Sequence, residues 1–369
     1  MKIHVVSFQV PYPANYGGVI DVYYKLKAMK EAGFEITLHT FTYDGRGRET
    51  NLETLCNRVF YYPRQTGWLQ QLSLLPYIVK TRDDKALLEN LCQDDVPILF
   101  EGLHTCYFLD HPRLENRRKI VRMHNIEHQY YSQLAKQSRW NWRMMFYTIE
   151  SWRLKRFERK LAHAQMICAI TEADQQELEK QLKGVEIIHL PCFFDTTCHQ
   201  LTRETKPYVL YHGNLAVEEN ERVAHYIIHK IAPLCPKVQF VLAGRNPRLG
   251  TQLPENIKLV PNPTEEEMDK LIQEARIHLM LTFQPTGIKL KLLNALVKGL
   301  GHVIANRDML YGHTLGMLCI QAENPYEIAQ QITLLIDNPM DKIQLEKRNA
   351  ELLKMKKAGI SRLSLLNRY

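Results

Sequence analysis

Two lysines and a glycine stand close together in the segment TGIKLK, residues 286–291. The segment follows an apolar run and opens an amphipathic one, so we expect it to lead from a strand into a helix. Gly287 allows the backbone to approach a ligand closely, and Lys289 and Lys291 place cations at a helix N-terminus, which itself attracts anions. The segment predicts a phosphate site that also includes Ile288; the alternative is a solvated basic first turn.

An arginine follows the most apolar run of the second half. Arg245 comes two residues after VQFVLA, residues 238–243, which we expect to be a buried strand. A guanidinium binds a diphosphate well because it forms paired, charge-assisted hydrogen bonds. We therefore predict that Arg245 contacts phosphate, with a surface salt bridge as the alternative.

Polar side chains also follow two predicted strands of the first half. One group comes after the run 97–100, and the sequence HNIEH comes after the run 119–123. Carboxylate, imidazole and amide groups at the ends of neighbouring strands can orient a polar substrate. The residues predicted to face such a substrate are Glu101, His104, His124, Asn125 and Glu127.

The sequence HNIEH also matches the zinc pattern H-x-x-E-H. A zinc site would require His124 and His128 on one face of a helix, with a third ligand from elsewhere. Because the motif directly follows a predicted strand, we expect no metal site here. A polar cluster at the strand end is favoured over a structural pair of histidines.

Each half of the chain has a glycine turn after its first predicted strand: Gly17 and Gly18 in the first half, and Gly213 in the second. Glycine lets the backbone come close to a phosphate, but a tight strand-to-helix turn explains it equally well. Neither turn has the form G-x-G-x-x-G, so a dinucleotide fingerprint is absent.

The elements that must position these residues alternate regularly between strand and helix. We expect strands at 3–9, 35–41, 97–100, 119–123, 165–170, 186–190, 208–211, 238–243, 257–259, 277–281 and 302–305. We expect helices at 19–32, 219–232, 264–274, 289–298 and 325–336, and a basic helical tail at 341–369. This alternation predicts α/β domains with parallel sheets that helices cover on both faces.

The alternation is interrupted once, by the polar segment 196–206. We therefore predict a first Rossmann-like domain at 1–195, a linker at 196–206 and a second Rossmann-like domain at 207–340. The helical tail, 341–369, is expected to pack back toward the first domain.

Composition is that of a globular protein: 369 residues, 45% hydrophobic and 24% charged. The net charge of +8 suits anionic small molecules or an anionic membrane, and gives little support to nucleic acid. None of the eight cysteines has zinc spacing, and no signal peptide or transmembrane run is apparent. We therefore expect a cytoplasmic protein.

Two segments of the first half combine aromatic and basic residues: 64–82 and 139–160. Such segments can lie peripherally on an anionic membrane, at the inner face of the plasma membrane for a cytoplasmic protein. They can equally be amphipathic helices that pack on the sheet.

Taken together, these motifs resemble the bacterial GT-B glycosyltransferases of retaining family 4, the "glycosyl transferases group 1". The similar segments are PYPANYGGVIDVYYKLKAMKEAGFEITLHTF, VRMHNIEHQYY, AITEADQQEL, YVLYHGNLAVEENERVAHYI, FVLAGRNP and TGIKLKLLNALVKGLGHVIAN. They extend over nearly the whole chain, and their order and spacing carry the resemblance.

The resemblance implies two Rossmann-like domains facing across a cleft. It implies retaining transfer of a sugar from a nucleoside-diphosphate-sugar to a hydroxyl acceptor, such as a glycan or lipid-linked acceptor of capsule or O-antigen synthesis, without metal or cofactor. The C-terminal domain would bind the donor and the N-terminal domain the acceptor. Gly18 would lie over the phosphates, His124 near the reacting sugar, and Lys291 in the donor loop.

The chain departs from the family pattern at several positions. The glutamates of the family's E-x7-E motif fall at Thr286 and Asn294, and its phosphate-binding arginine and lysine fall at Asn214 and Asn220. Asn214 and Asn294 are nonetheless predicted to contact the donor, because an amide can hydrogen-bond a hydroxyl. These departures leave two alternatives: a degenerate GT-B protein that binds without transfer, or another activity on this fold, such as epimerisation.

Overall fold

The computed structural model describes residues 1–14, 17–138, 142–194, 204–245, 247, 249–250, 252–285, 289–312 and 314–367. The described residues divide into two compact units. Unit 1 contains 1–194 and 355–367, and unit 2 contains 204–285 and 289–354, with the gaps just given. Most of the predicted linker, 196–206, lies outside the described residues, so this boundary stays a prediction.

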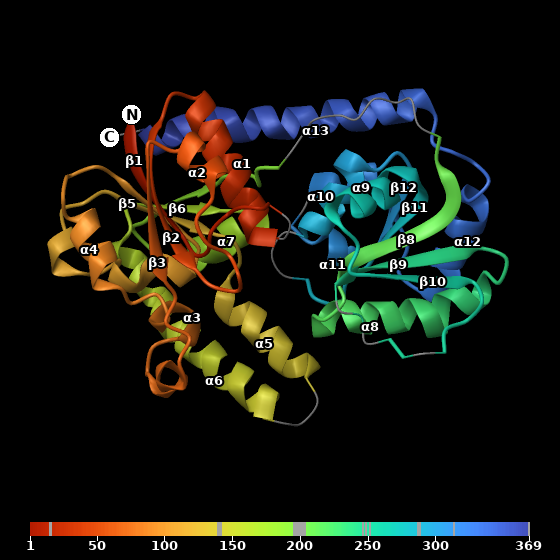
Figure 1. Ribbon diagram of the computed structural model, residues 1–369, viewed down its shortest axis with the longest axis horizontal. Coiled ribbons are helices and arrows are strands. Elements are labelled where there is room, and N and C mark those ends of the chain that lie inside the picture. Colours follow the sequence, from red (N-terminus) through yellow and green to blue (C-terminus); the bar gives the residue numbers. More distant parts are fainter. Residues whose placement is uncertain are drawn as a thin grey trace. The chain divides into compact units, whose positions relative to one another are not determined.

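Unit 1 (Figure 1) is built on a seven-stranded parallel sheet, whose strands follow the order β3-β2-β1-β4-β5-β6-β7. Its strands are β1 (Lys2–Ser7), β2 (Glu35–Thr42), β3 (Arg58–Pro63), β4 (Ile98–Glu101), β5 (Lys119–Met123), β6 (Met166–Ala169) and β7 (Glu186–His189). Its α-helices are α1 (Gly17–Glu31), α2 (Thr50–Leu55), α3 (Tyr77–Lys80), α4 (Lys85–Leu91), α5 (Glu127–Gln137), α6 (Trp142–Phe157) and α7 (Glu172–Gln181).

Helices cover both faces of this sheet, so its central strands are buried throughout. On β1, Val5 packs in the same apolar cluster as Leu26 of α1, whereas Val6 packs in the cluster on the opposite face. Helix α1 ends at Glu31, and Gly33 follows with a φ of +81°, a conformation that glycine adopts without steric cost.

Unit 2 contains a six-stranded parallel sheet in the order β10-β9-β8-β11-β12-β13. Its strands are β8 (Lys206–Asn214), β9 (Gln239–Arg245), β10 (Ile257–Pro261), β11 (Ala275–Met280), β12 (His302–Ala305) and β13 (Ile320–Gln321). Its helices include α8 (Glu218–Tyr226), α9 (Glu265–Glu274), α10 (Leu290–Lys298), α11 (Arg307–Leu310) and α12 (Pro325–Leu335). The predicted fold class of two parallel α/β units is confirmed. Among the strands, only the edge strands β3 and β13 were not predicted; the helices α2 to α7 and α11 had no predicted residue ranges.

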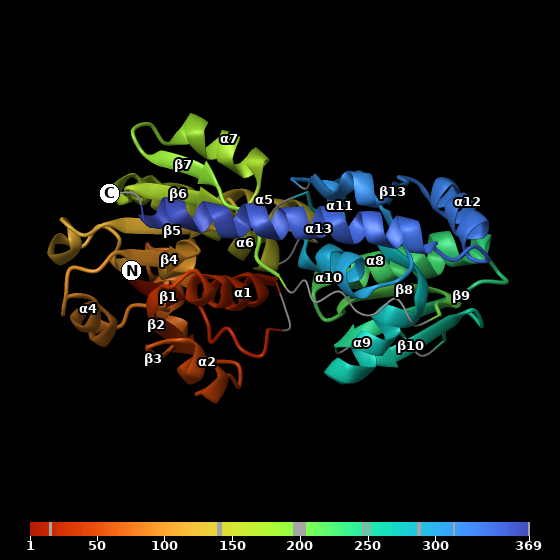
Figure 2. The same cartoon turned by 90° about the horizontal axis from the view of Figure 1, so that it is seen from above.

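Each sheet has one point where the strand order reverses. In unit 1, β1 lies between β2 and β4 (Figure 2), and in unit 2, β8 lies between β9 and β11. In open α/β sheets, ligands bind outside the carboxyl ends of the strands at such a switch point. The loops after β1 and β4, and those after β8 and β11, are therefore where a site is expected.

The chain ends in the helix α13 (Lys342–Leu363), whose last part belongs to unit 1. Leu363 and Leu366 are buried in the core of that unit, and Arg362 Nη1 donates a 2.7 Å hydrogen bond to the carbonyl of His189. Of the helices that the structure describes, none has both the length and the apolar character needed to cross a bilayer.

Candidate active site

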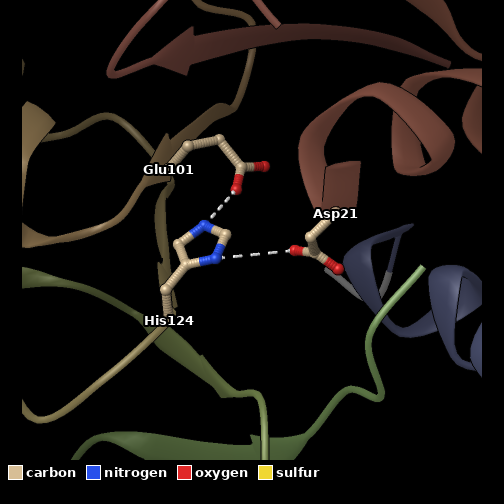
Figure 3. A group of neighbouring side chains, drawn as sticks. All are labelled: Asp21, Glu101 and His124. Atoms are coloured by element: carbon tan, nitrogen blue, oxygen red, sulfur yellow. Dashed lines mark hydrogen bonds and ion pairs between the residues drawn. The ribbon is translucent and has the colours of Figure 1, made fainter. Parts of the chain in front are cut away.

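At the switch point of unit 1, an imidazole lies between two carboxylates (Figure 3). His124 directly follows β5, and its Nε2 donates a 3.1 Å hydrogen bond to Glu101 at the end of β4. Its Nδ1 lies 3.8 Å from Oδ2 of Asp21, which α1 contributes. Both carboxylate side chains are fully buried, whereas that of His124 is 10% exposed. His124 is therefore the member of this group that can touch a ligand.

Two buried cations balance the two carboxylates. Lys25 Nζ lies 3.1 Å from Asp21 and 2.8 Å from Glu101. The guanidinium of Arg122 donates two hydrogen bonds to Asp21, of 3.2 and 3.1 Å. Burial alone would raise the pKa of both carboxyls, but the neighbouring cations outweigh it and hold the pKa of Asp21 and of Glu101 below the usual range. Both carboxylates are therefore ionised at neutral pH, and they fix the ring of His124.

Asp21, Glu101 and His124 form a possible donor set for a metal ion, since one ligand atom of each lies within 4.8 Å of the others. Lys25 and Arg122 already neutralise both carboxylates at contact distance. A divalent cation would face these two cations, so the set does not fit a metal ion. His128, the second histidine of HNIEH, is not part of this donor set, and its Nδ1 contacts Glu158 at 2.5 Å.

Beside His124, an aromatic ring occupies the space behind the glycine turn. The ring of Phe8 lies 5.4 Å from that of His104 and 5.7 Å from that of His124. A Cβ at Gly18 would lie 2.6 Å from this ring, whereas one at Gly17 would meet nothing within 4 Å. Gly18 is thus required for the approach of α1 to Phe8, which explains this glycine without a phosphate.

The other three residues predicted to face a substrate differ in access. His104 is buried, and burial, together with the nearby Arg82, holds its pKa well below its usual value. Glu127, in the first turn of α5, is also buried. Burial and the neighbouring Glu158 raise its pKa to about 8, so Glu127 is largely protonated at neutral pH. Asn125 is half-buried and hydrogen-bonds Glu127.

At the switch point of unit 2, three neutral acceptors hold the ammonium of Lys291. Its Nζ donates to Oδ1 of Asn220 at 3.0 Å, to the carbonyl of Leu281 at 3.2 Å and to the hydroxyl of Tyr211 at 3.3 Å. Asn220 Nδ2 in turn donates to the carbonyl of Asn214 at 3.0 Å. The Asn220 amide thus links the end of β8 to the first turn of α10.

Burial lowers the pKa of Lys291 to about 8, and the neighbouring Lys289 acts in the same direction against the attraction of Glu219. Lys289 also has a lowered pKa through burial, partly offset by Glu219 at 3.5 Å. Thr282 donates a short hydrogen bond to the Glu219 carboxylate. The two lysines are therefore largely enclosed and not a solvated basic turn, and they carry two positive charges against one carboxylate.

The remaining predicted residues of unit 2 lie at the same edge or outside the described chain. Arg245 ends β9 as an exposed residue and is paired in register with Asn214 of β8. A Cβ at Gly244 would clash with the carbonyl of Gly213, so these strand ends approach very closely. Asn294 lies half-buried on α10. The described residues do not include Gly287 and Ile288, whose roles stay predictions.

Sequence reasoning missed four charged residues of these clusters: Asp21, Lys25, Arg122 and Glu219. A signal existed for three of them. Asp21 and Lys25 are four apart and stand directly before Val22 and Leu26 of the apolar stripe of their helix, and Arg122 interrupts an apolar strand. Glu219 had no such signal, because acidic residues are common in the first turn of a helix.

Comparisons with known proteins identify a family domain in the second half of the chain. Residues 206–338 match the family model described as "Glycosyl transferases group 1". An uncharacterized 44.6 kDa protein from the cps region of Klebsiella pneumoniae is 24% identical over 316 residues, which cover 80% of each chain.

Solved structures show the same architecture over the full chain. Sucrose-phosphate synthase from Thermosynechococcus elongatus superposes with a TM-score of 0.70 at 14% identity, covering 100% of this chain and 98% of its own. HepE from Anabaena, in complex with UDP and glucose, gives a TM-score of 0.65 at 14% identity, covering 99% of each chain. TarM gives a TM-score of 0.65 at 11% identity, covering 98% and 95%. The chain thus contains a glycosyl transferases group 1 domain at residues 206–338, and its two parallel-sheet units have the fold of GT-B glycosyltransferase structures.

Proposed function

We propose that the protein transfers a sugar, with retention, from a nucleoside-diphosphate-sugar to a hydroxyl acceptor in surface-glycan synthesis in the cytoplasm. The observation that carries this proposal is the enclosed ammonium of Lys291, which neutral acceptors hold at the switch point of a group 1 domain. A cation with neutral partners retains its charge for an anionic ligand, and the leaving diphosphate develops negative charge during transfer.

The basic groups of unit 2 supply the charge that a bound metal would otherwise provide. Lys291 and Lys289 lie at the start of α10, and Arg245 lies at the end of β9. Together they would offset the charge of a diphosphate, so we propose that transfer needs no metal ion. In front-face attack the leaving phosphate accepts the acceptor's proton, so no dedicated base is required.

The proposed role of unit 1 is to bind the acceptor and orient the transferred sugar. His124 is held by Glu101, and the pair is backed by the buried cations described above. A fixed imidazole that is partly accessible can hydrogen-bond a sugar hydroxyl. The relative from a cps region supports a surface polysaccharide as the product, and the HepE complex supports a nucleotide-sugar as the donor.

A second candidate function is binding of a nucleotide-sugar without transfer. It is favoured by the carboxylate of Glu219, which contacts Lys289 in the proposed phosphate site, and by asparagines at positions 214 and 294. In this alternative the site would hold a donor but stabilise the leaving group too weakly for turnover.

The test is donor hydrolysis and sugar transfer by Lys291→Ala, measured beside wild type and Lys298→Ala. Lys298 lies on the same helix, but it pairs with Asp269 at 2.6 Å outside the proposed site. We expect Lys291→Ala to lose most of its turnover while staying folded, and Lys298→Ala to keep it. Near-normal turnover of Lys291→Ala would refute the assignment, and donor binding without turnover in wild type would favour the second candidate.

A further inference from the structure

Helix α6 of unit 1 displays a stripe of large apolar side chains. Trp142, Met145, Ile149 and Trp152 follow one another at spacings of three and four residues, which places them on one face of the helix. All four are exposed, with Trp142 at 71% and Trp152 at 59%. The opposite side of α6 packs on α5, with which it forms a helical hairpin between β5 and β6 (Figure 1).

A second apolar segment is fixed beside this stripe. The 3-10 helix η1 (Trp68–Leu72) contains no buried residue. Its exposed side chains include Trp68 at 68%. Arg153 of α6 donates a 3.1 Å hydrogen bond to the carbonyl of Gln71, and Glu150 of α6 accepts a 2.7 Å bond from the backbone of Tyr77. These contacts hold the segment against the helix.

We name this surface the tryptophan face. Its members are Trp68, Leu69, Leu72, Leu74, Trp142, Met145, Ile149 and Trp152. Three of the four tryptophans of the chain are among these members. An exposed apolar group of this size is unusual on a monomeric protein and marks an interaction surface.

The charges around the tryptophan face have one sign. Within α6 the exposed side chains are apolar or basic apart from Thr148, and the basic ones are Arg143, Lys155 and Arg156. Arg159, just after the helix, is also exposed. Both acidic residues of this stretch, Glu150 and Glu158, are buried and accept hydrogen bonds inside the unit. An approaching partner therefore meets apolar and cationic groups without exposed carboxylates from α6.

We propose that the tryptophan face docks unit 1 on an anionic lipid bilayer. Tryptophan favours the boundary between headgroups and acyl chains, and a helix with an apolar stripe and basic flanks lies in that boundary. Anionic lipids attract the basic flanks. A second copy of the chain fits less well, because its own basic flanks would repel these. This surface does not depend on sugar transfer, so the inference stands apart from the proposed function.

Three of the four tryptophans of the chain, Trp68, Trp142 and Trp152, belong to the tryptophan face, so tryptophan fluorescence reports mainly on this surface. Vesicles of phosphatidylglycerol in phosphatidylethanolamine should shift the emission to the blue, and brominated lipids should quench it. Vesicles of phosphatidylcholine should bind much more weakly. Unchanged emission and absent quenching with the anionic vesicles would overturn the proposal.

Two double variants separate the apolar from the electrostatic contribution in vesicle sedimentation. Trp142→Ser with Trp152→Ser should weaken binding at least tenfold. Lys155→Glu with Arg156→Glu should weaken vesicle binding at least ~25-fold, because each basic side chain strengthens binding about fivefold. All four side chains are exposed, so the melting temperature should stay within a degree or so of wild type.

The matched control is Lys230→Glu with Lys258→Glu, two exposed lysines of unit 2. It should bind anionic vesicles like wild type. An equal loss in this control would overturn the proposal in favour of unspecific charge attraction. Dimerisation without vesicles, seen in sedimentation equilibrium and abolished by the tryptophan variant, would overturn it in favour of a second copy of the chain.

Discussion

Donor binding should depend on pH through a single lysine. Burial lowers the pKa of Lys291 to about 8, so the group titrates within the range where enzymes are assayed. The cationic fraction falls from about nine-tenths at pH 7 to about one-tenth at pH 9, and a diphosphate diester keeps its charge throughout. If the diphosphate binds only the cation, donor affinity should fall about tenfold between pH 7 and pH 9.

Calorimetry gives a second, independent readout of the same event. A bound diphosphate favours the cation and raises the pKa of Lys291, so donor binding at pH 8 should take up about half a proton. This uptake is measured by titration in two buffers of different ionisation enthalpy. Because the pKa is lowered in the fold from 10.5, the donor-free protein should also gain stability as the pH rises from about 8 toward 10.5.

Two variants isolate the lysine responsible. Lys291→Arg carries a charge that does not titrate in this range, so it should remove both the pH dependence and the proton uptake. Lys298→Arg, on the same helix but paired with Asp269, should leave both unchanged. The reasoning would be refuted if wild-type affinity were flat up to pH 9, or if Lys291→Arg showed the same decline.

Three further predictions concern unit 1 and are checked by chemical denaturation. Gly18→Ala should destabilise the protein by about 1–3 kcal/mol because its Cβ would meet an aromatic ring, whereas Gly17→Ala should be neutral or stabilising; equal effects would contradict this. Lys25→Met should lower the free energy of unfolding by about 3–5 kcal/mol, because two buried carboxylates lose a neighbouring positive charge. The control Lys27→Met, at an exposed position, should lower it by less than about 0.5 kcal/mol. A similarly small loss for Lys25→Met would count against the charge cluster. The pKa of Glu127 is raised to about 8, so wild type should lose stability relative to Glu127→Gln as the pH rises from about 4.5 to 8; a stability difference that stays constant over this range would disprove the burial argument.

Local sequence patterns were sufficient to predict the strands that lie inside each sheet. Central parallel strands are buried on both faces, so β1, β5 and β12 appear as short apolar runs between turn residues. The edge strand β3 was missed because it is only half-buried. It begins at Arg58 and ends at Pro63, so it lacks the continuous apolar run of a central strand. A strand of two residues, β13, has too few side chains to show any period.

The candidate site could be predicted only where its residues belong to one segment. Lys289 and Lys291 were recognised as an anion site because a glycine and a helix start stand beside them in the sequence. That Asn220 holds Lys291 depends on contacts between segments 71 residues apart. The family pattern has a lysine at the position of Asn220. The structure explains the asparagine, because a lysine there would repel Lys291.

The central claim is that unit 2 binds a nucleotide-sugar through Lys291 without metal. The most direct measurement is a thermal-shift series with UDP-, GDP- and ADP-sugars in EDTA, on wild type and Lys291→Ala. A donor present at a hundred times its Kd adds about 2.7 kcal/mol to the free energy of unfolding. This should raise the Tm by several degrees in wild type and by little in the variant. A well-folded wild type that no donor stabilises, or an equal shift in Lys291→Ala, would contradict the claim.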